Sequence, residues 1–377
     1  MDFGLSADQR LLCSTTREFL AKSVPLDVVR GLAATGIGFD RSWWRRGAEL
    51  GWTAPLVPED LGGGSVSGAP VADLALVASE FGRACAPGPL VTISAVLAGV
   101  VRERDRFAEL LDAVLSGQTI AAWAHYEPGH GLGPAAVDTL AVPDGDGFHV
   151  RGVKDRVECG DQAEVFLVTV RGPDGPMQVL IAADAPGVTI TPTWTLDLVR
   201  RTATVEFADV LVGRDAVVHR DPDETAAALD AQWQIAATLT AAESAGAAAH
   251  AFGLTTRWMF DRYTFGRQLA SYQALKHRAA EHITSLEACQ ATAWAAANAF
   301  GNDPISTAEA VSVAKSYISA VTPGLLQDCV QIHGGIGVTW EHDLHLYLRR
   351  VTFGRALYGT PEEHRRRLTD LLDRKVA

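Results

Sequence analysis

Two glycine-bearing blocks in the last third of the chain contain the residue types that bind phosphate groups. The first, DRYTFGRQLASYQALKHRAAE, covers residues 261–281, and the second, CVQIHGGIGVTWEHDLHLYLRR, covers residues 329–350. Glycine lets a backbone approach a pyrophosphate closely, and arginine supplies a positive charge with a fork of donors. By itself, the Gly-Gly-x-Gly run is typical of an ordinary helix end and turn. Together, the two blocks predict a phosphate-binding site.

The segment WEHDLHLY, residues 340–347, contains a glutamate and two histidines, which are residue types that bind metals. Their spacing around an amphipathic turn favours a helix that faces another subunit. His333, in QIHGG, is expected to pack at a helix end rather than to do acid–base work. The sequence therefore predicts no metal site.

The elements that must position these residues fall into three zones. Residues 1–118 carry helical patterns and predict an N-terminal helical domain, and residues 119–222 carry short β-prone runs between turn residues such as PDGDG and GPDGP. Residues 223–377 return to helix and predict a C-terminal bundle, with a very long helix candidate over 223–264. Helix, strand and helix occur in blocks rather than in alternation, which indicates an α+β multidomain fold with a separate β domain.

Composition narrows the class of partners. The 377 residues carry 33 Lys and Arg against 45 Asp and Glu, a formal net charge of −12, which argues against nucleic acid or an anionic membrane surface as the main partner. Five scattered cysteines without a Cys-x-x-Cys spacing favour reduced thiols in a cytosolic protein. No signal peptide and no membrane span are visible in the sequence, so we expect a cytoplasmic location.

At this point the chain resembles the acyl-CoA dehydrogenase family nearly end to end, and within it the actinobacterial-type members that form hetero-oligomers. The segments that carry the resemblance are LGWTAPLVPEDLGGGSVS, GFHVRGVKDRVECGDQAEVFLVTVR, LDLVRRTATVEFADVLV, the Arg-x-x-Phe-Gly block and QIHGGIG. The resemblance implies an N-terminal α-helical domain, a middle antiparallel β-barrel or sheet domain, and a C-terminal four-helix bundle that mediates oligomerisation.

The resemblance also implies an FAD cofactor between the middle and C-terminal domains, with its ADP part held by a neighbouring subunit. Carried over by motif, the ADP-binding residues are Arg262, Thr264, Phe265, Gln273, Gln331, Gly334 and Gly335, and the turn that approaches the flavin holds Gly359 and Thr360. The implied reaction is α,β-desaturation of an acyl-CoA thioester. A carboxylate removes the α-proton, and a hydride passes from the β-carbon to flavin N5.

This sequence departs from the family pattern where the catalytic carboxylate is expected. Tyr358 stands where a glutamate usually precedes the Gly-Thr turn, and the alternative base position, with the arginine beside it, falls on Ala236 and Ala237. Positions of the middle domain that usually contact flavin also differ, namely Tyr126-Glu127-Pro128, Leu132 and Arg156-Val157-Glu158. These changes weaken the case for a flavin ring docked on this chain's own middle domain.

One acidic candidate for the base remains. Glu243, in TLTAAESAG, lies seven residues after Ala236 and so on nearly the same face of the long helix, two turns further along. Small neighbours leave room there for a ligand or a close helix, and a carboxylate in an Ala-rich helix is costly to bury without a reason. Two interpretations stay open: Glu243 is the catalytic base, or it is partly exposed or pairs with an arginine of another helix.

The sequence therefore predicts an acyl-CoA dehydrogenase subunit in lipid or steroid degradation. Its expected partners are an acyl-CoA substrate, a homologous subunit in a heterotetramer or else a homo-oligomer, and an electron-transfer acceptor. The alternative is a catalytically silent subunit that completes the FAD site of a homologous chain. A CoA-thioester-binding scaffold, or a flavin oxidase or monooxygenase with the same fold, are further alternatives.

Overall fold

The computed structural model describes residues 4–36, 38–131, 137–219 and 221–376. It divides into two compact units, each built from separate stretches of chain. The first unit combines residues 1–30, 71–86 and 237–377, and the second combines residues 31–70 and 87–236. The sequence boundaries at residues 118 and 222 stay a prediction.

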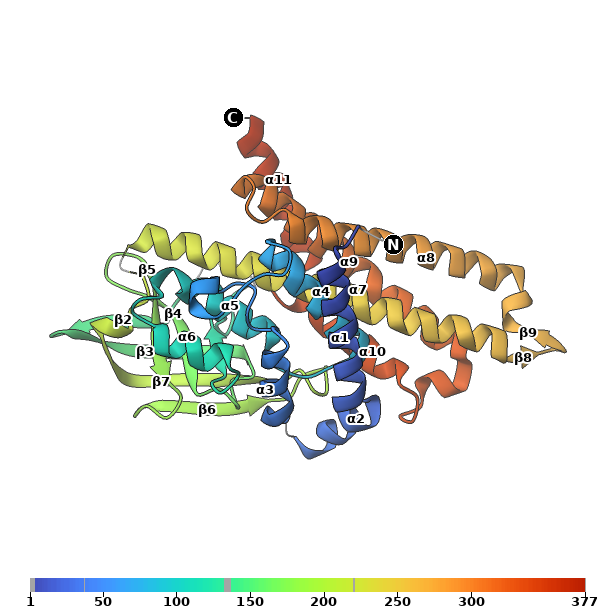
Figure 1. Ribbon diagram of the computed structural model, residues 1–377, viewed down its shortest axis with the longest axis horizontal. Helices are drawn as coiled ribbons and strands as arrows, with labels where there is room; N and C mark the ends of the chain where they lie inside the picture. The colour runs from blue at the N-terminus through green and yellow to red at the C-terminus, as the bar shows by residue number, and fades with distance from the viewer. Residues whose placement is uncertain (1–3, 37, 132–136, 220, 377) are drawn as a thin grey trace. The chain divides into compact units, whose positions relative to one another are not determined.

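The helices and strands follow the expected order along the chain (Figure 1). The helices are α1 (Ala7–Ser23), α2 (Leu26–Thr35), α3 (Arg41–Glu49), α4 (Pro70–Ala84), α5 (Leu90–Val100), α6 (Ala108–Leu115), α7 (Pro222–Asp261), α8 (Gln273–Asn298), α9 (Pro304–His333), α10 (Leu344–Ala356) and α11 (Pro361–Val376), with the 3₁₀ turns η1 (Glu59–Leu61), η2 (Val101–Glu103), η3 (Arg214–Ala216), η4 (Leu269–Ser271) and η5 (Gly334–Val338). The strands are β1 (Ala121–Ala124), β2 (Leu140–Asp144), β3 (Gly147–Glu158), β4 (Val165–Arg171), β5 (Pro176–Ala182), β6 (Val188–Thr193), β7 (Thr202–Gly213), β8 (Tyr263–Thr264) and β9 (Arg267–Gln268).

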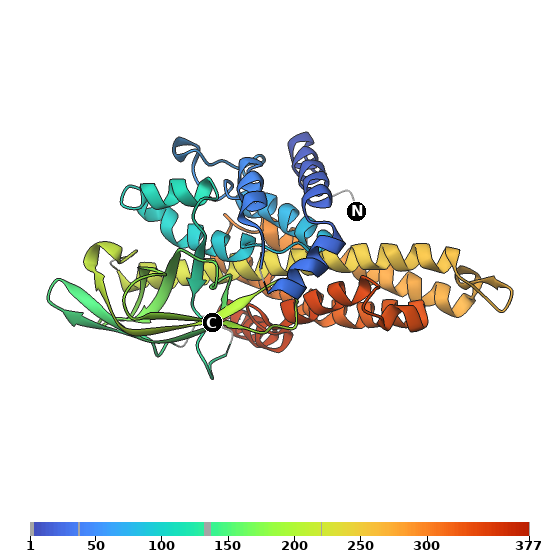
Figure 2. The same cartoon turned by 90° about the horizontal axis from the view of Figure 1, so that it is seen from below.

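Helices of the first unit form the bundle that the sequence predicted. Alanine is the best helix former, and Asp223 and Glu224 in the first turn of α7 complement the positive end of its dipole. Helix α9 packs against α8, α10 and α11, and it runs without a break through Pro323. Figures 1 and 2 show the β8–β9 hairpin at the end of the bundle where α7 ends and α8 begins.

Two glycines set the crossing of α4 and α7. A side chain at Gly246 would collide with the carbonyl of Ser79, and one at Gly82 would collide with the carbonyl of Glu243. The backbones therefore approach each other more closely than any larger residue allows. This close approach fixes the position of Glu243 beside α4.

A curled mixed sheet forms the centre of the second unit, with strand order β1-β4-β2-β3-β7-β6 and β5 paired to β4. The sequence predicted antiparallel strands, and most pairs are antiparallel, but β4 runs parallel to both β1 and β2. The connections β1–β4 and β2–β4 are not hairpins, so these neighbours can run in the same direction. Buried Val, Ile and Phe side chains, among them Phe166, Val205 and Phe207, fill the space inside the curl.

The architecture confirms the expected α+β fold of N-terminal helices, a β sheet and a C-terminal helical bundle. All five cysteines are free, and four of them are buried. Within the described ranges, no helix combines the length and apolar character that a membrane span requires.

Candidate functional site

The β8–β9 hairpin presents the first set of predicted ADP-binding residues. Phe265 and Gly266 form its tip with φ angles of 51° and 78°, so a glycine-like backbone is used at both positions. The Tyr272 hydroxyl donates to the Thr264 carbonyl at 2.8 Å, and the Leu269 N–H donates to the Arg262 carbonyl at 2.8 Å. These contacts fix the hairpin between the two helices.

The second set lies at the C-terminal end of α9. The helix stops at His333 because Gly334 adopts a φ of 67°, which favours glycine. The His333 ring stacks on Trp258, with centroids 5.2 Å apart, and its Nδ1 lies 2.8 Å from the Cys329 carbonyl. Burial lowers the pKa of His333, so the ring stays neutral and packs at the helix end, as the sequence predicted.

A small apolar cluster brings the two sets to the same end of the bundle. Met259, Ala270 and Ile332 pack together in it. Met259 lies one turn before Arg262, Ala270 lies three residues before Gln273, and Ile332 directly follows Gln331. Residues that are 60 or more positions apart in sequence thus become neighbours through the packing of α7, α8 and α9.

The donors at this end suit the phosphates of a dinucleotide. Arg262, Gln273 and Gln331 are exposed, and the Arg262 guanidinium forms no ion pair with any of the residues that the structure describes. Side chains built on Gly334 or Gly335 would meet nothing within 4 Å. The Arg262 guanidinium lies over the Trp258 ring at 5.9 Å. A guanidinium without an acidic partner and backbone amides at glycines are groups that bind a pyrophosphate. The residues present therefore fit the ADP half of FAD.

The turn at residues 358–360 is occupied by the chain's own contacts. Tyr358 is buried with a φ of 53°, and its carbonyl accepts a hydrogen bond from His364 Nε2 at 2.9 Å. The Thr360 N–H donates to the Glu363 carboxylate at 2.8 Å, and the Glu363 N–H donates to the Thr360 hydroxyl at 3.2 Å. This reciprocal pair is a capping box that starts α11. Gly359 and Thr360 keep the turn, and Glu363 is committed to the helix end.

Glu243 forms a buried ion pair with an arginine of another helix. Its Oε1 accepts a hydrogen bond from Arg350 Nη1 at 2.6 Å, and the two residues are 6% and 2% exposed. Arg350 also donates to the carbonyls of Ala86 and Cys85, at 3.0 and 3.2 Å. The guanidinium thus joins α10, α7 and the segment after α4. Pairing with an arginine of another helix was one of the two interpretations of Glu243 that the sequence left open.

Sequence reasoning did not single out Arg350. The signal was available, because Leu344, Tyr347, Val351 and Gly354 form the buried stripe of α10 and Arg350 lies on that stripe. An arginine at a buried helical position requires a partner. The sequence did not indicate which of the acidic residues that partner is.

The middle-domain positions that depart from the family pattern are also engaged in this chain's own contacts. Strand β3 bulges between Lys154 and Val157, and Arg156 sits in that bulge with a φ of 51°. Its guanidinium lies over the Tyr126 ring at 5.2 Å and donates to the Glu127 carbonyl at 3.0 Å. The bulge therefore directs Arg156 onto the Tyr126 segment.

Two buried ion pairs stabilise the same region. Lys154 donates to the Glu127 carboxylate at 2.6 Å. Burial opposes ionisation of Glu127, but the contact with Lys154 outweighs it and lowers the pKa to about 2. Glu158 accepts from the Arg200 Nε at 2.8 Å. Arg156 thus contacts the Tyr126–Glu127 segment, whereas Glu158 pairs with Arg200. Leu132 lies outside the described residues.

Comparison with known proteins identifies the class and then the family. A variant of the Tcur3481-Tcur3483 steroid ACAD superposes with a TM-score of 0.86 at 29% identity, covering 98% of both chains. Models of the acyl-CoA dehydrogenase N-terminal and C-terminal domains match residues 6–103 and 228–372. The acyl-CoA dehydrogenase IpdE2 of Mycobacterium tuberculosis is 30% identical over 96% of both proteins. IpdE2 of Mycolicibacterium smegmatis is 29% identical over 97% of this chain and 98% of that protein.

The chain belongs to the acyl-CoA dehydrogenase family. The chain is therefore an oxidoreductase acting on acyl-CoA. FAD is the cofactor of this family. The geometry at the end of the bundle agrees with that cofactor, because the exposed donors fit the ADP half. The roles of the individual site residues belong to the proposal that follows.

Proposed function

We propose that this chain is one subunit of an FAD-dependent acyl-CoA dehydrogenase that works as a hetero-oligomer with a homologous chain. The proposed substrate is a bulky, steroid-derived acyl-CoA. The likeness to a solved steroid ACAD whose name joins two components supports this choice. The proposed re-oxidant of the flavin is an electron-transfer partner, and the proposed location is the cytoplasm.

The Glu243–Arg350 ion pair is the observation that carries the assignment of roles. A general base must reach the substrate's α-proton with a carboxylate of suitable basicity. Glu243 is instead buried against a guanidinium at 2.6 Å, and the two other base positions hold Tyr358 and Ala236. We therefore favour a role in which the homologous partner supplies the base and this chain is catalytically silent.

In this role the chain contributes the ADP-binding half of a shared FAD site. Arg262, Gln273 and Gln331 would bind the phosphates and the adenosine side, while Gly334 and Gly335 would let backbone amides approach closely. Thr264 and Phe265 would position the hairpin against the cofactor, and Gly359 with Thr360 would shape the turn near the flavin. When bound, FAD accepts the hydride from the substrate's β-carbon.

Purification of the chain alone and together with a homologous chain encoded beside it tests the hetero-oligomer. We expect little FAD on the isolated chain, and about one FAD per heterodimer with acyl-CoA-dependent flavin bleaching after co-expression. The isolated chain could instead carry one FAD per subunit and be reduced by an acyl-CoA. That result would contradict the proposal and would favour a homo-oligomeric enzyme.

Substitution of Glu243 in the active assembly tests the identity of the base. We expect Glu243→Gln to leave kcat within about threefold of the wild type once the assembly is shown to be intact. Arg350→Met is the matched control, because it breaks the same ion pair without removing the carboxylate. A loss of kcat of about 10³-fold or more in Glu243→Gln, with Arg350→Met still active, would identify Glu243 as the base and overturn the silent role.

A further inference from the structure

A buried histidine lies in the second unit, among residues that the proposed function does not use. His219 follows β7 and η3 and precedes α7, and it is 3% exposed. Its Nε2 is buried, and within the described part of the chain this atom has no hydrogen-bond partner. The other ring nitrogen, Nδ1, faces a carboxylate, so this buried ring has one nitrogen without a partner and one beside an acidic group.

Glu103, at the end of η2, faces this ring with one carboxylate oxygen. Its Oε1 lies 3.9 Å from His219 Nδ1, while its Oε2 accepts a hydrogen bond from Arg106 Nη1 at 3.0 Å. Arg106 therefore holds the far oxygen of the carboxylate and leaves the near oxygen directed to His219. Such support of a ligand by an outer hydrogen bond is characteristic of metal sites.

Arg106 also fixes the segment that delivers His219. Its guanidinium donates to the carbonyls of Asp215, Val217 and Val218 at distances of 2.7 to 3.0 Å. One arginine thus sets the positions of both Glu103 and the backbone that leads to His219. The two side chains are held in place by the same group, although they are far apart in sequence.

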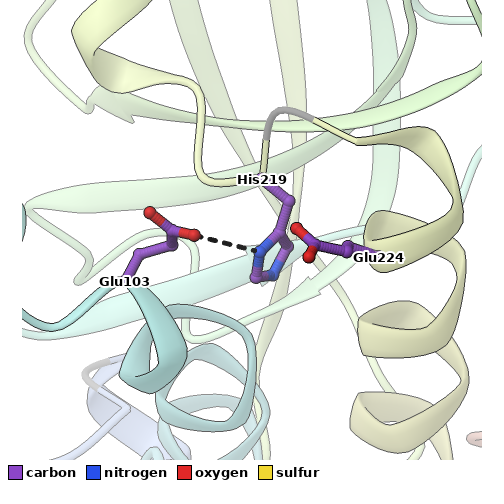
Figure 3. Close-up of side chains that lie close together, drawn as sticks. All are labelled: Glu103, His219 and Glu224. Atoms are coloured by element: carbon purple, nitrogen blue, oxygen red, sulfur yellow. Dashed lines mark ion pairs between the residues drawn. The ribbon is translucent and has the colours of Figure 1, made fainter.

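Glu224 brings a second carboxylate from the first turn of α7. Figure 3 shows Glu103 and Glu224 on opposite sides of the His219 ring, and one ligand atom from each of the three residues lies within 4.8 Å of the other two. A zinc ion about 2.0–2.2 Å from each ligand separates them by roughly 3.4 Å, so small side-chain rotations would close the set. One imidazole and two carboxylates form a donor set that divalent first-row metals accept.

One of the three residues, His219, also borders a cavity. This cavity has a volume of about 350 Å³ and is also lined by Phe148, Arg214 and Pro222. Burial lowers the pKa of His219, and the Glu103 carboxylate and the Gly99 backbone oppose that shift. A neutral imidazole retains the lone pair that a metal requires.

We propose that Glu103, His219 and Glu224 form a binding site for a divalent transition-metal ion of the Zn²⁺ type. This site goes beyond the flavin chemistry of the family, and it would tie η2, the segment after β7 and the start of α7 together. The sequence predicted no metal because the three residues are more than a hundred positions apart at their extremes and share no spacing motif.

Metal titration of the untagged full-length chain tests this site. After removal of metal with a chelator, Zn²⁺ is titrated by isothermal calorimetry, and Co²⁺ is added separately to obtain its absorption spectrum. We expect about one equivalent of Zn²⁺ per chain and Co²⁺ bands typical of four- or five-fold coordination. Uptake well below half an equivalent would overturn the proposal.

Two charge-matched variants in the same helical turn give the specificity control. Glu224→Gln should weaken Zn²⁺ binding at least tenfold, whereas Asp223→Asn, which removes the same charge one residue earlier, should bind like the wild type. Both residues are exposed, so both variants should fold, and far-UV circular dichroism checks this. Equal affinities in the two variants would show adventitious binding elsewhere and would contradict the site.

Discussion

At the scale of single residues, the ion pair with Arg350 decides between the two interpretations of Glu243, as the catalytic base or as a structural residue. The carboxylate is buried against the guanidinium at 2.6 Å, and the same guanidinium satisfies two backbone carbonyls. A buried ion pair of this kind contributes little net stability compared with apolar residues of the same size, but loss of one partner strands a buried charge. Removal of one partner should therefore lower the stability of the fold, whether or not Glu243 takes part in catalysis.

The loss of stability on breaking the pair can be predicted for Arg350→Met and for Glu243→Gln. Arg350→Met should lower the free energy of unfolding of the isolated chain by about 3–5 kcal/mol, because the buried Glu243 would lose its partner. Glu243→Gln should cost less, since Arg350 keeps its two carbonyl acceptors. Urea unfolding followed by circular dichroism measures both values.

The double variant Glu243→Gln/Arg350→Met supplies the matching control. It removes both charges, so it should recover part of the stability lost in Arg350→Met. The recovery stays incomplete because the carbonyls of Cys85 and Ala86 lose their donor. Strictly additive effects of the two single changes would mean that the pair is not coupled in solution.

At the scale of elements, the α4–α7 crossing depends on glycine. Gly246→Ala should lower the free energy of unfolding by about 2 kcal/mol or more, because the new methyl group would collide with the Ser79 carbonyl. Gly253→Ala is the matched control on the same helix, where a methyl group meets nothing within 4 Å. That change should be neutral or stabilise by roughly 0.5–1 kcal/mol, since alanine favours helix more than glycine does. Equal effects would contradict a close crossing.

A buried histidine in the first turn of α11 should make the stability of the fold depend on pH. His364 is buried, and burial together with the charge of Lys315 lowers its pKa to about 3, while its hydrogen bond to Tyr358 and the Glu363 charge oppose the shift. The unfolded chain, with an ordinary histidine pKa near 6.5, binds the proton more readily between pH 6.5 and 3. Stability due to this group is therefore complete above about pH 6.5 and falls as the pH drops.

Comparison of the wild type with His364→Gln measures this contribution. From pH 7 to pH 5, the wild type should lose about 2 kcal/mol more of its free energy of unfolding than the variant does. Glutamine can still donate to the Tyr358 carbonyl, so the variant should fold. Parallel pH profiles for the two proteins would show that His364 does not titrate differently on folding.

At the scale of the whole molecule, the fold leaves an aromatic hairpin tip uncovered. Phe265 is 99% exposed, and the neighbouring Tyr263 and Phe260, in the last turn of α7, are exposed as well. A single chain gains nothing from a fully exposed phenylalanine. In the proposed assembly, this end of the bundle would contact the cofactor and a neighbouring subunit, which would give these side chains a function.

Because Phe265 is fully exposed, its substitution should affect assembly without affecting folding. Phe265→Ala should change the unfolding free energy of the isolated chain by less than about 0.5 kcal/mol, yet it should lower FAD retention and heteromer formation severalfold in co-purification. Trp194→Ala is the control, because Trp194 is 94% exposed in the second unit and has no predicted cofactor role. If both variants retain FAD and partner equally well, Phe265 has no part in assembly.

Much of the fold was predictable from the sequence because its signals are local. The Ala-rich pattern predicted the long helix over 223–264, and the structure has α7 at Pro222–Asp261. Turn residues such as PDGDG separated β-prone runs, and β2 and β3 flank that turn. The mixed character of the sheet was not predictable, because strand direction depends on which distant strand becomes the neighbour.

The sequence by itself determined which residues occupy the family's motif positions, including the hairpin arginine at 262, the glycines at 334 and 335, and the absence of a carboxylate at Tyr358 and Ala236. These are identities at positions along one chain, so no packing is needed to read them. Tertiary structure decided the partner of Glu243, which is 107 residues away, and the meeting of Glu103, His219 and Glu224. Such pairings depend on where helices cross and how closely their backbones approach, and a local pattern does not encode those distances.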